Sequence, residues 1–198
     1  MDAMHNLEFA DPIEWFGQWL AEAERSEPND ANAAALATAT PDGSPSVRMV
    51  LVKRADARGF CFFTNVESKK GNQLQANPRA ALCFHWKSLR RQVRVEGRVT
   101  AMPAADVDAY FHSRSRDSQI GAAVSQQSHP LASREDLDAR FQKFAAEHPG
   151  EIPRPPYWCG FCVEPEQIEF WINGDNRLHD RFLFTRDAGA WRTTRLYP

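Results

Sequence analysis

The sequence lacks long apolar runs and any large excess of charge, and each absence excludes a class of protein. No stretch of the 198 residues is apolar for long enough to span a membrane. The N-terminal MDAMHNLEFADP has neither the basic start nor the apolar segment of a secretory signal. A formal net charge of -2 argues against general binding to nucleic acids or acidic membranes. We therefore expect a cytoplasmic protein with no nucleic-acid and no membrane partner.

Cysteine is scarce, with four residues in the chain: Cys61, Cys83, Cys159 and Cys162. In a cytoplasmic protein we expect free thiols in apolar surroundings. Cys159 and Cys162 form a C-x-x-C motif, which also occurs in redox and zinc sites. This motif lies in a strand-like run, where its spacing sends the two thiols to opposite faces, and no second ligand pair follows. The sequence therefore predicts four free thiols and no metal site.

Internal repeats and low-complexity tracts are also missing. A hydrophobic content of 42% suffices for one sizeable core, so we predict a single domain over residues 1–198, with residues 1–10 as a short N-terminal arm. The first helix is predicted from Pro12, with Asp11 as its cap, to about Glu24, and its apolar stripe serves packing. Alternating patterns predict strands over residues 33–40, 46–54, 59–65, 80–86, 91–101, 158–163 and 190–196.

Other helices are expected to flank these strands, over residues 68–77, 104–112 and 133–144. The last of them has an apolar side expected to be buried, made of Leu137, Phe141 and Phe144. Gly97 marks an expected bulge in the strand 91–101. Residues 110–130 are polar and weakly periodic, which indicates a functional loop or a loose linker. The predicted fold class is mainly β with flanking helices, arranged as a partly open, mostly antiparallel β-barrel.

The segment QIEFWINGDNRLHDRF, residues 167–182, is typical of a β-hairpin. In its first arm Ile168, Phe170 and Ile172 share one face, and a turn rich in Asn and Gly follows. In its second arm, alternation predicts that one face carries the cations Arg177, His179 and Arg181. The other face is expected to carry Leu178 and Phe182.

The cationic row of Arg177, His179 and Arg181 is either the solvated face of an edge strand or a surface that faces a ligand. Trp171 lies close to it in the hairpin, and a histidine can both donate and accept hydrogen bonds. These neighbours favour a flat, anionic, aromatic ligand.

A second cationic position lies at the predicted helix that begins at Ser68. Lys69 and Lys70 stand in its first turn, where cations oppose the helix dipole unless an anion is bound. Amides at a helix N-terminus together with two lysines predict a phosphate site. The alternative is a pair of solvated lysines at a frayed helix end.

Several longer motifs stand in a fixed order along the chain: RMVLVK, FFTN followed by SKKGNQL, RRQVRVEG, YFHSRSRDSQIGAAVSQQS, and QIEFW with RLHDRF. Over nearly its whole length the chain thereby resembles the pyridoxamine 5'-phosphate oxidase family. The resemblance implies an FMN-binding split β-barrel that forms a homodimer with two active sites at the subunit interface. It also implies oxidation of pyridoxamine or pyridoxine 5'-phosphate by O2 to pyridoxal 5'-phosphate, with release of hydrogen peroxide.

The same resemblance implies the ligand contacts. The FMN phosphate and ribityl chain are assigned to Arg48, Lys69, Lys70, Gln127 and Ser128. The flavin ring is assigned to Met49, Val50, Leu51, Val52, Lys53, Phe63, Thr64, Gln92, Trp171 and Arg181. The substrate phosphate is assigned to Lys53, Tyr110, Arg114 and Ser118, and the pyridine ring to Arg177, Leu178 and His179. Arg177 and His179 are the catalytic candidates, as orienting and electrostatic groups.

The chain departs from the family pattern at three places. Phe63 stands where Tyr is common, and Ala123 stands where a bulkier residue is expected. The arm of residues 1–10 is short and not basic, so weaker closure over the substrate is expected. In addition, Arg48 and Lys53 should face opposite ways on a regular strand, so a bulge or a ligand wrapped around the strand end is required.

Two other functions stay open on the sequence. One is a related FMN oxidase of the phenazine-pathway type, against which the predicted phosphate contacts of Lys53, Arg114 and Ser118 argue. The other is a non-catalytic protein that binds flavin or pyridoxal phosphate. Peroxide release on addition of pyridoxamine 5'-phosphate separates these functions.

Overall fold

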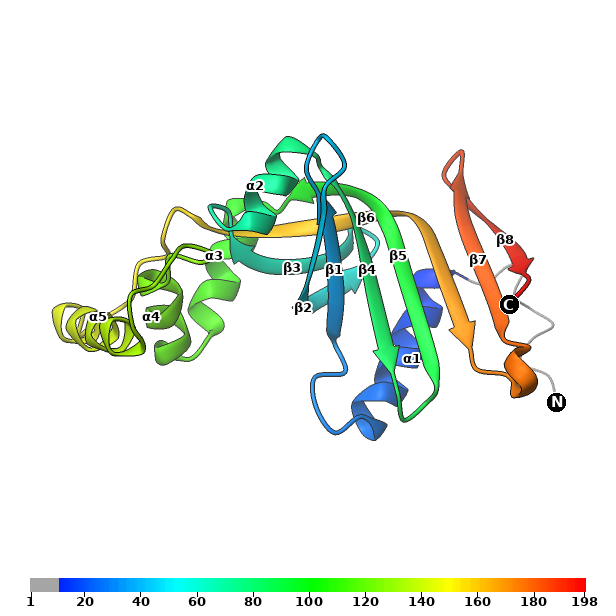
Figure 1. Cartoon of the computed structure of the whole chain (residues 1–198), viewed down its shortest axis with the longest axis horizontal. Coiled ribbons are helices and arrows are strands. Elements are labelled where there is room, and N and C mark those ends of the chain that lie inside the picture. The colour runs from blue at the N-terminus through cyan, green and yellow to red at the C-terminus, as the bar shows by residue number, and fades with distance from the viewer. Residues whose placement is uncertain (1–10) are drawn as a thin grey trace.

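The strands form one antiparallel sheet that closes on itself. The computed structural model describes residues 11–198, and the predicted N-terminal arm, residues 1–10, lies outside them. The sheet has eight strands in the order β3-β2-β1-β4-β5-β6-β7-β8, and β3 also pairs with β6. That last pairing closes β1 to β6 into a barrel, while β7 and β8 extend beyond it as a hairpin (Figure 1). The prediction of a mainly β, antiparallel barrel is confirmed.

Most strand bounds agree with the predicted alternation. The strands are β1 (Ala33–Ala39), β2 (Pro45–Asp56), β3 (Gly59–Asn65), β4 (Arg79–Trp86), β5 (Arg91–Ala101), β6 (Trp158–Ile172), β7 (Asp180–Asp187) and β8 (Ala190–Leu196). Strand β6 differs, because it is one long strand rather than a short strand and a separate hairpin arm. It continues through Pro165, which lies opposite Gly97 at a bulge in the β5–β6 pairing. A Cβ at Gly97 would lie 1.9 Å from the Glu164 carbonyl oxygen, so this close approach requires glycine.

Helix α1 (Pro12–Ser26) packs into the barrel core, as its apolar stripe predicts. The Asp11 carboxylate caps it by accepting a hydrogen bond of 2.8 Å from the Ile13 backbone N–H. Phe16 is buried, and its ring lies 4.8 Å from the rings of both Phe60 and Phe84. This helix therefore stabilises the barrel interior and takes no part in lining the cavities described below.

A second, smaller core lies at the other end of the molecule, where three helices gather (Figure 1). They are α3 (Ala104–Ser113), α4 (Arg116–Val124) and α5 (Arg134–Glu147), and α2 (Lys69–Ala76) lies beside the barrel. The prediction of a loop or linker over residues 110–130 is wrong in part, because it contains α4. Ser115 caps α4, and Ile120 of this helix is buried. One cap and one buried apolar side chain are therefore sufficient for a helix to form in an otherwise polar segment.

Helix α5 is also less buried than predicted. None of its residues is fully buried, and Leu137, Phe141 and Phe144 are only half-buried. The reason is that α5 packs mainly on α4 rather than on the sheet. No helix in the described part of the chain is long and apolar enough to cross a membrane.

The cysteines differ from the prediction of four free thiols. Cys61 on β3 lies directly opposite Cys162 on β6, and the two form a disulfide. Cys83 and Cys159 are free. The two cysteines of the C-x-x-C motif are not bonded to each other, in keeping with their alternation along β6. The pairing depends on the β3–β6 register between residues 101 positions apart, which no local pattern reveals.

Candidate active site

A cavity of about 740 Å³ lies where the barrel meets the helical end of the molecule. It is lined by the middle of β2, the end of β3, the start of β6, Lys70 of α2, α3 and α4, and the segment that follows α4. Twelve of the residues that the sequence analysis assigned to ligands come together here: Arg48, Met49, Val50, Leu51, Lys53, Phe63, Thr64, Lys70, Tyr110, Arg114, Ser118 and Gln127. The fold thus gathers segments that are far apart in sequence.

The charges in this cavity have one sign. Arg48, Lys53, Lys70 and Arg114 line it, and none of the lining residues is Asp or Glu. The Nη1 atom of Arg114 is buried and has no hydrogen-bond partner within residues 11–198. These cations have no compensating carboxylate in the cavity, and Arg114 has an unsatisfied buried donor. Both features indicate a site for an anionic ligand.

Lys70 is the most deeply placed of these cations, with 8% of its surface exposed. Its Nζ donates hydrogen bonds to Thr64 Oγ1 at 3.0 Å, Gln127 Oε1 at 2.6 Å and Ser68 Oγ at 3.3 Å. Burial, together with the nearby charge of Arg48, lowers the pKa of Lys70 to about 8. Lys69, its neighbour in the predicted phosphate site, is exposed and does not line the cavity.

Arg48 is held in place by a polar network that the sequence analysis missed. Its guanidinium donates to the Leu36 carbonyl at 3.0 Å and to Thr38 Oγ1 at 2.7 Å, and also to Ser46 Oγ. The buried Gln73 Oε1 accepts from Thr38 and Ser46, both at 2.6 Å. Burial lowers the pKa of Arg48. The network fixes the direction of this arginine before any ligand binds.

The geometry of β2 explains how Arg48 and Lys53 reach the same cavity. The pairing of β2 with β3 shifts register between Val52 and Arg54, so Lys53 stands at a β-bulge. A bulge inserts one residue and reverses the alternation beyond it. The bulge, one of the two explanations predicted for this odd spacing, is present. Met49 and Leu51, which alternate with Arg48, line the same cavity, so its lining is not confined to one face of β2.

One wall of the cavity is aromatic. The rings of Phe63 and Tyr110 stack at 4.0 Å, and those of Phe63 and Trp158 at 5.1 Å. The guanidinium of Arg114 lies 5.2 Å from the Trp158 ring centre. Trp158 was predicted only as a strand residue, and it reaches this wall because β6 pairs with β3, where Trp158 lies opposite Asn65. Other lining residues that the sequence analysis missed are Asn65, Gly121, Ala122 and Ser125.

The hairpin end of the molecule carries a second cavity, of about 480 Å³, which shares no lining residue with the first. Trp171, Arg177 and His179 line it, together with Arg90 and the turn at 173–176. The rings of Trp171 and His179 lie 4.5 Å apart. His179 Nδ1 accepts a hydrogen bond of 3.2 Å from the Gly174 N–H, so its proton is on Nε2.

The predicted cationic row is wrong in its geometry. Residues Asp175–Arg177 form a 3₁₀ turn, and β7 begins only at Asp180, so Arg177 and His179 do not belong to the strand of Arg181. Leu178 and Phe182 do not share a face either, since the exposed fractions of these side chains are 70% and 5%. The backbone turns back at Gly174, where a Cβ would lie 1.9 Å from the Leu178 carbonyl oxygen.

Arg181 belongs to a different group. It forms an ion pair of 2.8 Å with Glu169, which is 5% exposed and also contacts Arg94. Burial raises the pKa of Glu169, but hydrogen bonds from Arg181 and Arg94 outweigh it and hold the pKa below its usual value. The predicted ligand contacts that line neither of these two cavities are Val52, Lys69, Gln92, Ser128, Leu178 and Arg181.

Two family models match the chain. Residues 20–172 match the model described as pyridoxamine 5'-phosphate oxidase. Residues 158–198 match the pyridoxine 5'-phosphate oxidase C-terminal dimerisation region. The chain is 57% identical to the pyridoxine/pyridoxamine 5'-phosphate oxidase of Gluconobacter oxydans, over 96% of this chain and 95% of that protein. It is also 57% identical to the enzyme of that name from Rhodospirillum rubrum, over 98% and 100%.

Solved structures agree with these matches. PhzG from Burkholderia lata in complex with tetrahydrophenazine-1-carboxylic acid is 34% identical, with a TM-score of 0.90 over 95% of this chain and 93% of that one. A pyridoxamine 5'-phosphate oxidase-related, FMN-binding protein from Nostoc punctiforme is 20% identical, with a TM-score of 0.80 over 96% and 99%, and supports the split-barrel fold alone. The chain therefore belongs to the pyridoxamine 5'-phosphate oxidase family.

Proposed function

We propose that the chain is an FMN-dependent oxidase of pyridoxamine 5'-phosphate and pyridoxine 5'-phosphate. Its products are pyridoxal 5'-phosphate and hydrogen peroxide, with O2 as the oxidant. The observation that carries the proposal is the large cavity, in which four cations meet with no lining carboxylate. FMN and substrate each carry a phosphate, and two phosphates require several cations. The relatives that are 57% identical bear the name of the same activity.

The residues of the large cavity fit FMN. A volume of about 740 Å³ lies within the usual range of small-molecule sites. Lys70, Arg48 and Gln127 form a polar end suited to the flavin phosphate, because an anion restores the stabilisation that the Lys70 ammonium loses on burial. Phe63 and Thr64 border the space for the ring system. When bound, the flavin supplies the two-electron chemistry for which side chains have no equivalent.

Lys53, Tyr110, Arg114 and Ser118 are suited to the substrate phosphate. The buried Nη1 of Arg114 has no partner among the described residues and can donate to a phosphate oxygen. Ser118 Oγ accepts a hydrogen bond of 2.8 Å from Ser115 Oγ, so the proton of Ser118 remains available for the ligand. These residues orient the substrate and balance its charge.

Arg177 and His179 act in this proposal on the pyridine ring of the substrate. The Gly174 N–H occupies Nδ1 of His179, which leaves Nε2–H as the donor toward a ligand. The Arg177 side chain is exposed and lines the same cavity. Both groups position the substrate and adjust the charge around it, and the chemistry requires no nucleophile from the chain.

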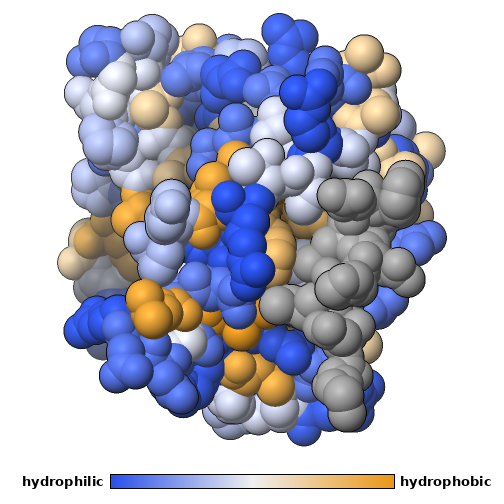
Figure 2. Space-filling view, turned by 90° about the vertical axis from the view of Figure 1, so that its right-hand side faces the viewer, coloured by the Kyte–Doolittle hydropathy of each residue, from blue (hydrophilic) through white to orange (hydrophobic). Residues whose placement is uncertain are grey.

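The proposal includes a homodimer, because the two cavities are separate in one copy of the chain. Beside the large cavity, the outer row of β2 is apolar and exposed, with 68% of Val47, 63% of Met49 and 39% of Leu51 accessible. The side of the molecule that carries the β7–β8 hairpin shows apolar patches among hydrophilic side chains (Figure 2). Such surfaces suit an interface through which a second copy brings Arg177 and His179 to the large cavity. The match to a dimerisation region supports this arrangement.

The direct test is to load the protein with FMN and add pyridoxamine 5'-phosphate in air-saturated buffer. We expect hydrogen peroxide and pyridoxal 5'-phosphate in equal amounts, and the same result with pyridoxine 5'-phosphate. An FMN-loaded protein that binds the substrate yet forms neither product would instead be a non-catalytic binder of flavin or of the vitamer.

A second candidate is the phenazine-type oxidase, which the TM-score of 0.90 to PhzG favours. Its ligand, tetrahydrophenazine-1-carboxylic acid, has a carboxylate and no phosphate. A protein of this type would oxidise that compound and lose little activity on Lys53→Ala. For this protein we expect a large loss of activity on Lys53→Ala and no oxidation of that compound. The reason is that Lys53 and Arg114 line the cavity in addition to Arg48 and Lys70, which provides cations for a second phosphate.

The proposal also places the protein in the cytoplasm, as one domain over residues 1–198. Strand β6 takes part in both the barrel and the terminal hairpin, which supports folding as one unit. Fractionation of the native cells tests the location, and a single unfolding transition tests the domain number.

A further inference from the structure

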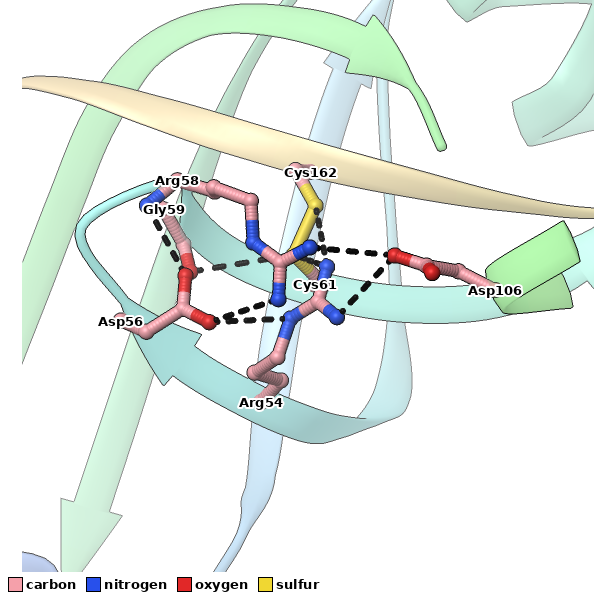
Figure 3. Close-up of polar contacts among 7 residues, drawn as sticks. All are labelled: Arg54, Asp56, Arg58, Gly59, Cys61, Asp106 and Cys162. Carbon is pink, nitrogen blue, oxygen red and sulfur yellow. Dashed lines mark hydrogen bonds and ion pairs between the residues drawn. A yellow bond between two sulfur atoms is a disulfide. The ribbon is translucent and has the colours of Figure 1, made fainter. Parts of the chain in front are cut away.

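The disulfide lies at the seam that closes the barrel. Cys61 and Cys162 are register partners in the β3–β6 pairing, and 0% and 5% of their surfaces are exposed (Figure 3). Phe63 and Thr64, two and three residues beyond Cys61 on the same strand, line the large cavity. A covalent bond at this position therefore joins the strand that borders the proposed cofactor site to the long strand β6.

The positively charged guanidinium of Arg54 contacts both sulfur atoms. The Nη2 atom of Arg54 is 3.6 Å from Cys61 Sγ and 4.0 Å from Cys162 Sγ (Figure 3). Asp56 and Asp106 hold the guanidinium there, at 3.2 Å and 3.4 Å. In the reduced protein the same arginine stabilises a thiolate, and the thiolate is the reactive form of cysteine.

The two cysteines differ in burial, with 5% of Cys162 and 0% of Cys61 exposed. Cys162 lines an opening of about 300 Å³ on the outside of the barrel, whereas Cys61 does not line it. The charged groups that face the pair or this opening come from β2, the β2–β3 turn, α3, β6 and β7. They are Arg54, Asp56, Arg58, Asp106, Glu164 and Arg186. A small neutral oxidant can enter such an opening, and Cys162 is the sulfur it meets first.

The other two cysteines lack these features. Burial raises the pKa of the Cys83 thiol, and burial raises that of Cys159 to about 11. Neither has a bonded partner. Both are protonated at neutral pH, so they should react with peroxide more slowly than the Cys61–Cys162 pair in the same protein.

We propose that Cys61 and Cys162 are a peroxide-reactive dithiol, with Cys162 as the attacking and Cys61 as the resolving cysteine. The Cys162 thiolate attacks one oxygen of hydrogen peroxide, an S–O bond forms, the O–O bond breaks, and hydroxide leaves and is protonated to water. The Cys61 thiolate then attacks the Cys162 sulfur, the S–S bond forms, and the S–O bond breaks with loss of a second water. Two thiols are oxidised to a disulfide and one peroxide is reduced to two waters.

The source of the peroxide rests on the proposed function, because the proposed oxidase reaction releases hydrogen peroxide. The consequence for the protein is structural. The bond closes a loop of 101 residues across the barrel seam. Such a long closed loop restricts the unfolded chain strongly. We expect the oxidised holoenzyme to unfold about 10 °C above the reduced one.

The test uses the FMN-loaded Cys83→Ser/Cys159→Ser variant, in which only the pair remains. The protein is reduced, freed of reductant and exposed to added hydrogen peroxide, and its mass and thiol content are measured. We expect a loss of about 2 Da and of both thiols, with the rise in unfolding temperature. Thiols that persist under peroxide while a general thiol control is oxidised would overturn the proposal.

Single variants assign the roles. Cys61→Ser should leave a sulfenic acid on Cys162 that dimedone traps, whereas Cys162→Ser should give no adduct. Arg54→Gln should slow oxidation at pH 7 about threefold, because a higher thiol pKa lowers the thiolate fraction more than it raises nucleophilicity. Arg58→Gln is the matched control, since Arg58 contacts Asp56 and Asp106 but neither sulfur. Equal rates for both arginine variants would overturn the role of Arg54.

A second arm separates this inference from the proposed function. Substrate is added in place of peroxide, with and without catalase, and oxidation of the pair should occur only without catalase. If added peroxide closes the bond while substrate yields no peroxide, the dithiol stands and the proposed function fails. If substrate yields peroxide and the thiols remain reduced, the proposed function stands and the dithiol is overturned.

Discussion

The large cavity and the hairpin cavity differ in how far each is organised in a single copy of the chain. In the large cavity, Lys70 and Arg48 are held by hydrogen bonds to Thr64, Thr38 and Gln127. In the hairpin cavity the Arg177 guanidinium has no hydrogen-bond or ion-pair partner among residues 11–198. The first region is suited to a ligand that stays bound, and the second to a ligand that comes and goes.

The sign of the local charge differs as well. No carboxylate lines the large cavity, whereas Asp175 lines the hairpin cavity beside Arg177. A phosphate is therefore favoured in the first region more strongly than in the second. In the proposed homodimer, the hairpin cavity of one copy would therefore complete the large cavity of the other.

The sharpest way to break this comparison is to remove one cation from each region. Lys70→Ala should weaken FMN binding about ten- to a hundredfold, since a charge-assisted hydrogen bond is lost. Arg177→Ala should keep FMN and lower kcat/KM for pyridoxamine 5'-phosphate by a similar factor. Flavin fluorescence titration measures the first ligand and peroxide formation the second.

Lys143→Ala and Arg134→Ala are matched controls, because both residues are exposed on α5. They should change neither quantity. Loss of FMN from Arg177→Ala, with FMN retained in Lys70→Ala, would reverse the assignment of the two regions.

Mixed dimers test whether the two regions meet across an interface. Lys70→Ala and Arg177→Ala protein, each expected to have at most about a tenth of the wild-type activity at limiting FMN and substrate, are unfolded, mixed in equal amounts and refolded together with FMN. If each site takes Lys70 from one copy and Arg177 from the other, one site of every mixed dimer is intact. Half of the dimers are mixed, so activity should recover to about one quarter of the wild-type value. If the activity of the refolded mixture only equals the average of the two separate variants, Lys70 and Arg177 of each site come from the same copy.

The pH dependence of FMN binding sharpens the role of Lys70. Its pKa of about 8 in the free protein should rise when a phosphate lies beside it, so FMN binds the protonated form. The affinity should be constant between about pH 7 and pH 8, where the FMN phosphate is dianionic, and fall by up to about tenfold per pH unit above pH 8. Lys70→Arg stays charged throughout, and its affinity should not fall over the same range. A wild-type affinity that is flat to pH 10 contradicts the assignment.

The smallest effect is expected from the two free cysteines, Cys83 and Cys159, neither of which lines either cavity. Cys159 lies beside Lys70, and Cys83 Sγ lies 3.4 Å from Gln92 Oε1. Both thiols are protonated at neutral pH, because burial raises their pKa. Cys83→Ser combined with Cys159→Ser should therefore leave FMN affinity and turnover within about twofold. A tenfold loss of FMN affinity or turnover in a folded variant would show that one of these thiols contributes to ligand binding or catalysis.

The two regions also differ in how well the sequence predicted them. The short apolar run Gly59–Asn65 and the alternation of Arg91–Ala101 predicted β3 and β5 with correct bounds, because such local patterns are typical of strands. The odd spacing of Arg48 and Lys53 predicted either a bulge or a ligand wrapped around the strand end, and β2 has a bulge at Lys53. At the hairpin the same alternation failed, since Asn176 and Arg177 have positive φ values of 54° and 66°. Two residues in the left-handed region end the alternation.

The cysteine prediction failed for a different reason. Composition and compartment predict free thiols as a class, but they carry no information on which strands pair. The disulfide exists because barrel closure puts Cys61 opposite Cys162. In the same way, the half-buried face of α5 depends on the helix that it packs against.

By itself the sequence determined the strands, the first helix, the family and the set of cations, because residue type and spacing carry these properties. The tertiary structure alone decided that Lys70 is buried and Lys69 exposed, and that Arg181 pairs with Glu169. It also decided that Arg177 and His179 line a separate cavity and that Cys61 meets Cys162. Burial, register and ion pairing join residues that are distant along the chain, so their outcome depends on the closed barrel rather than on any local pattern.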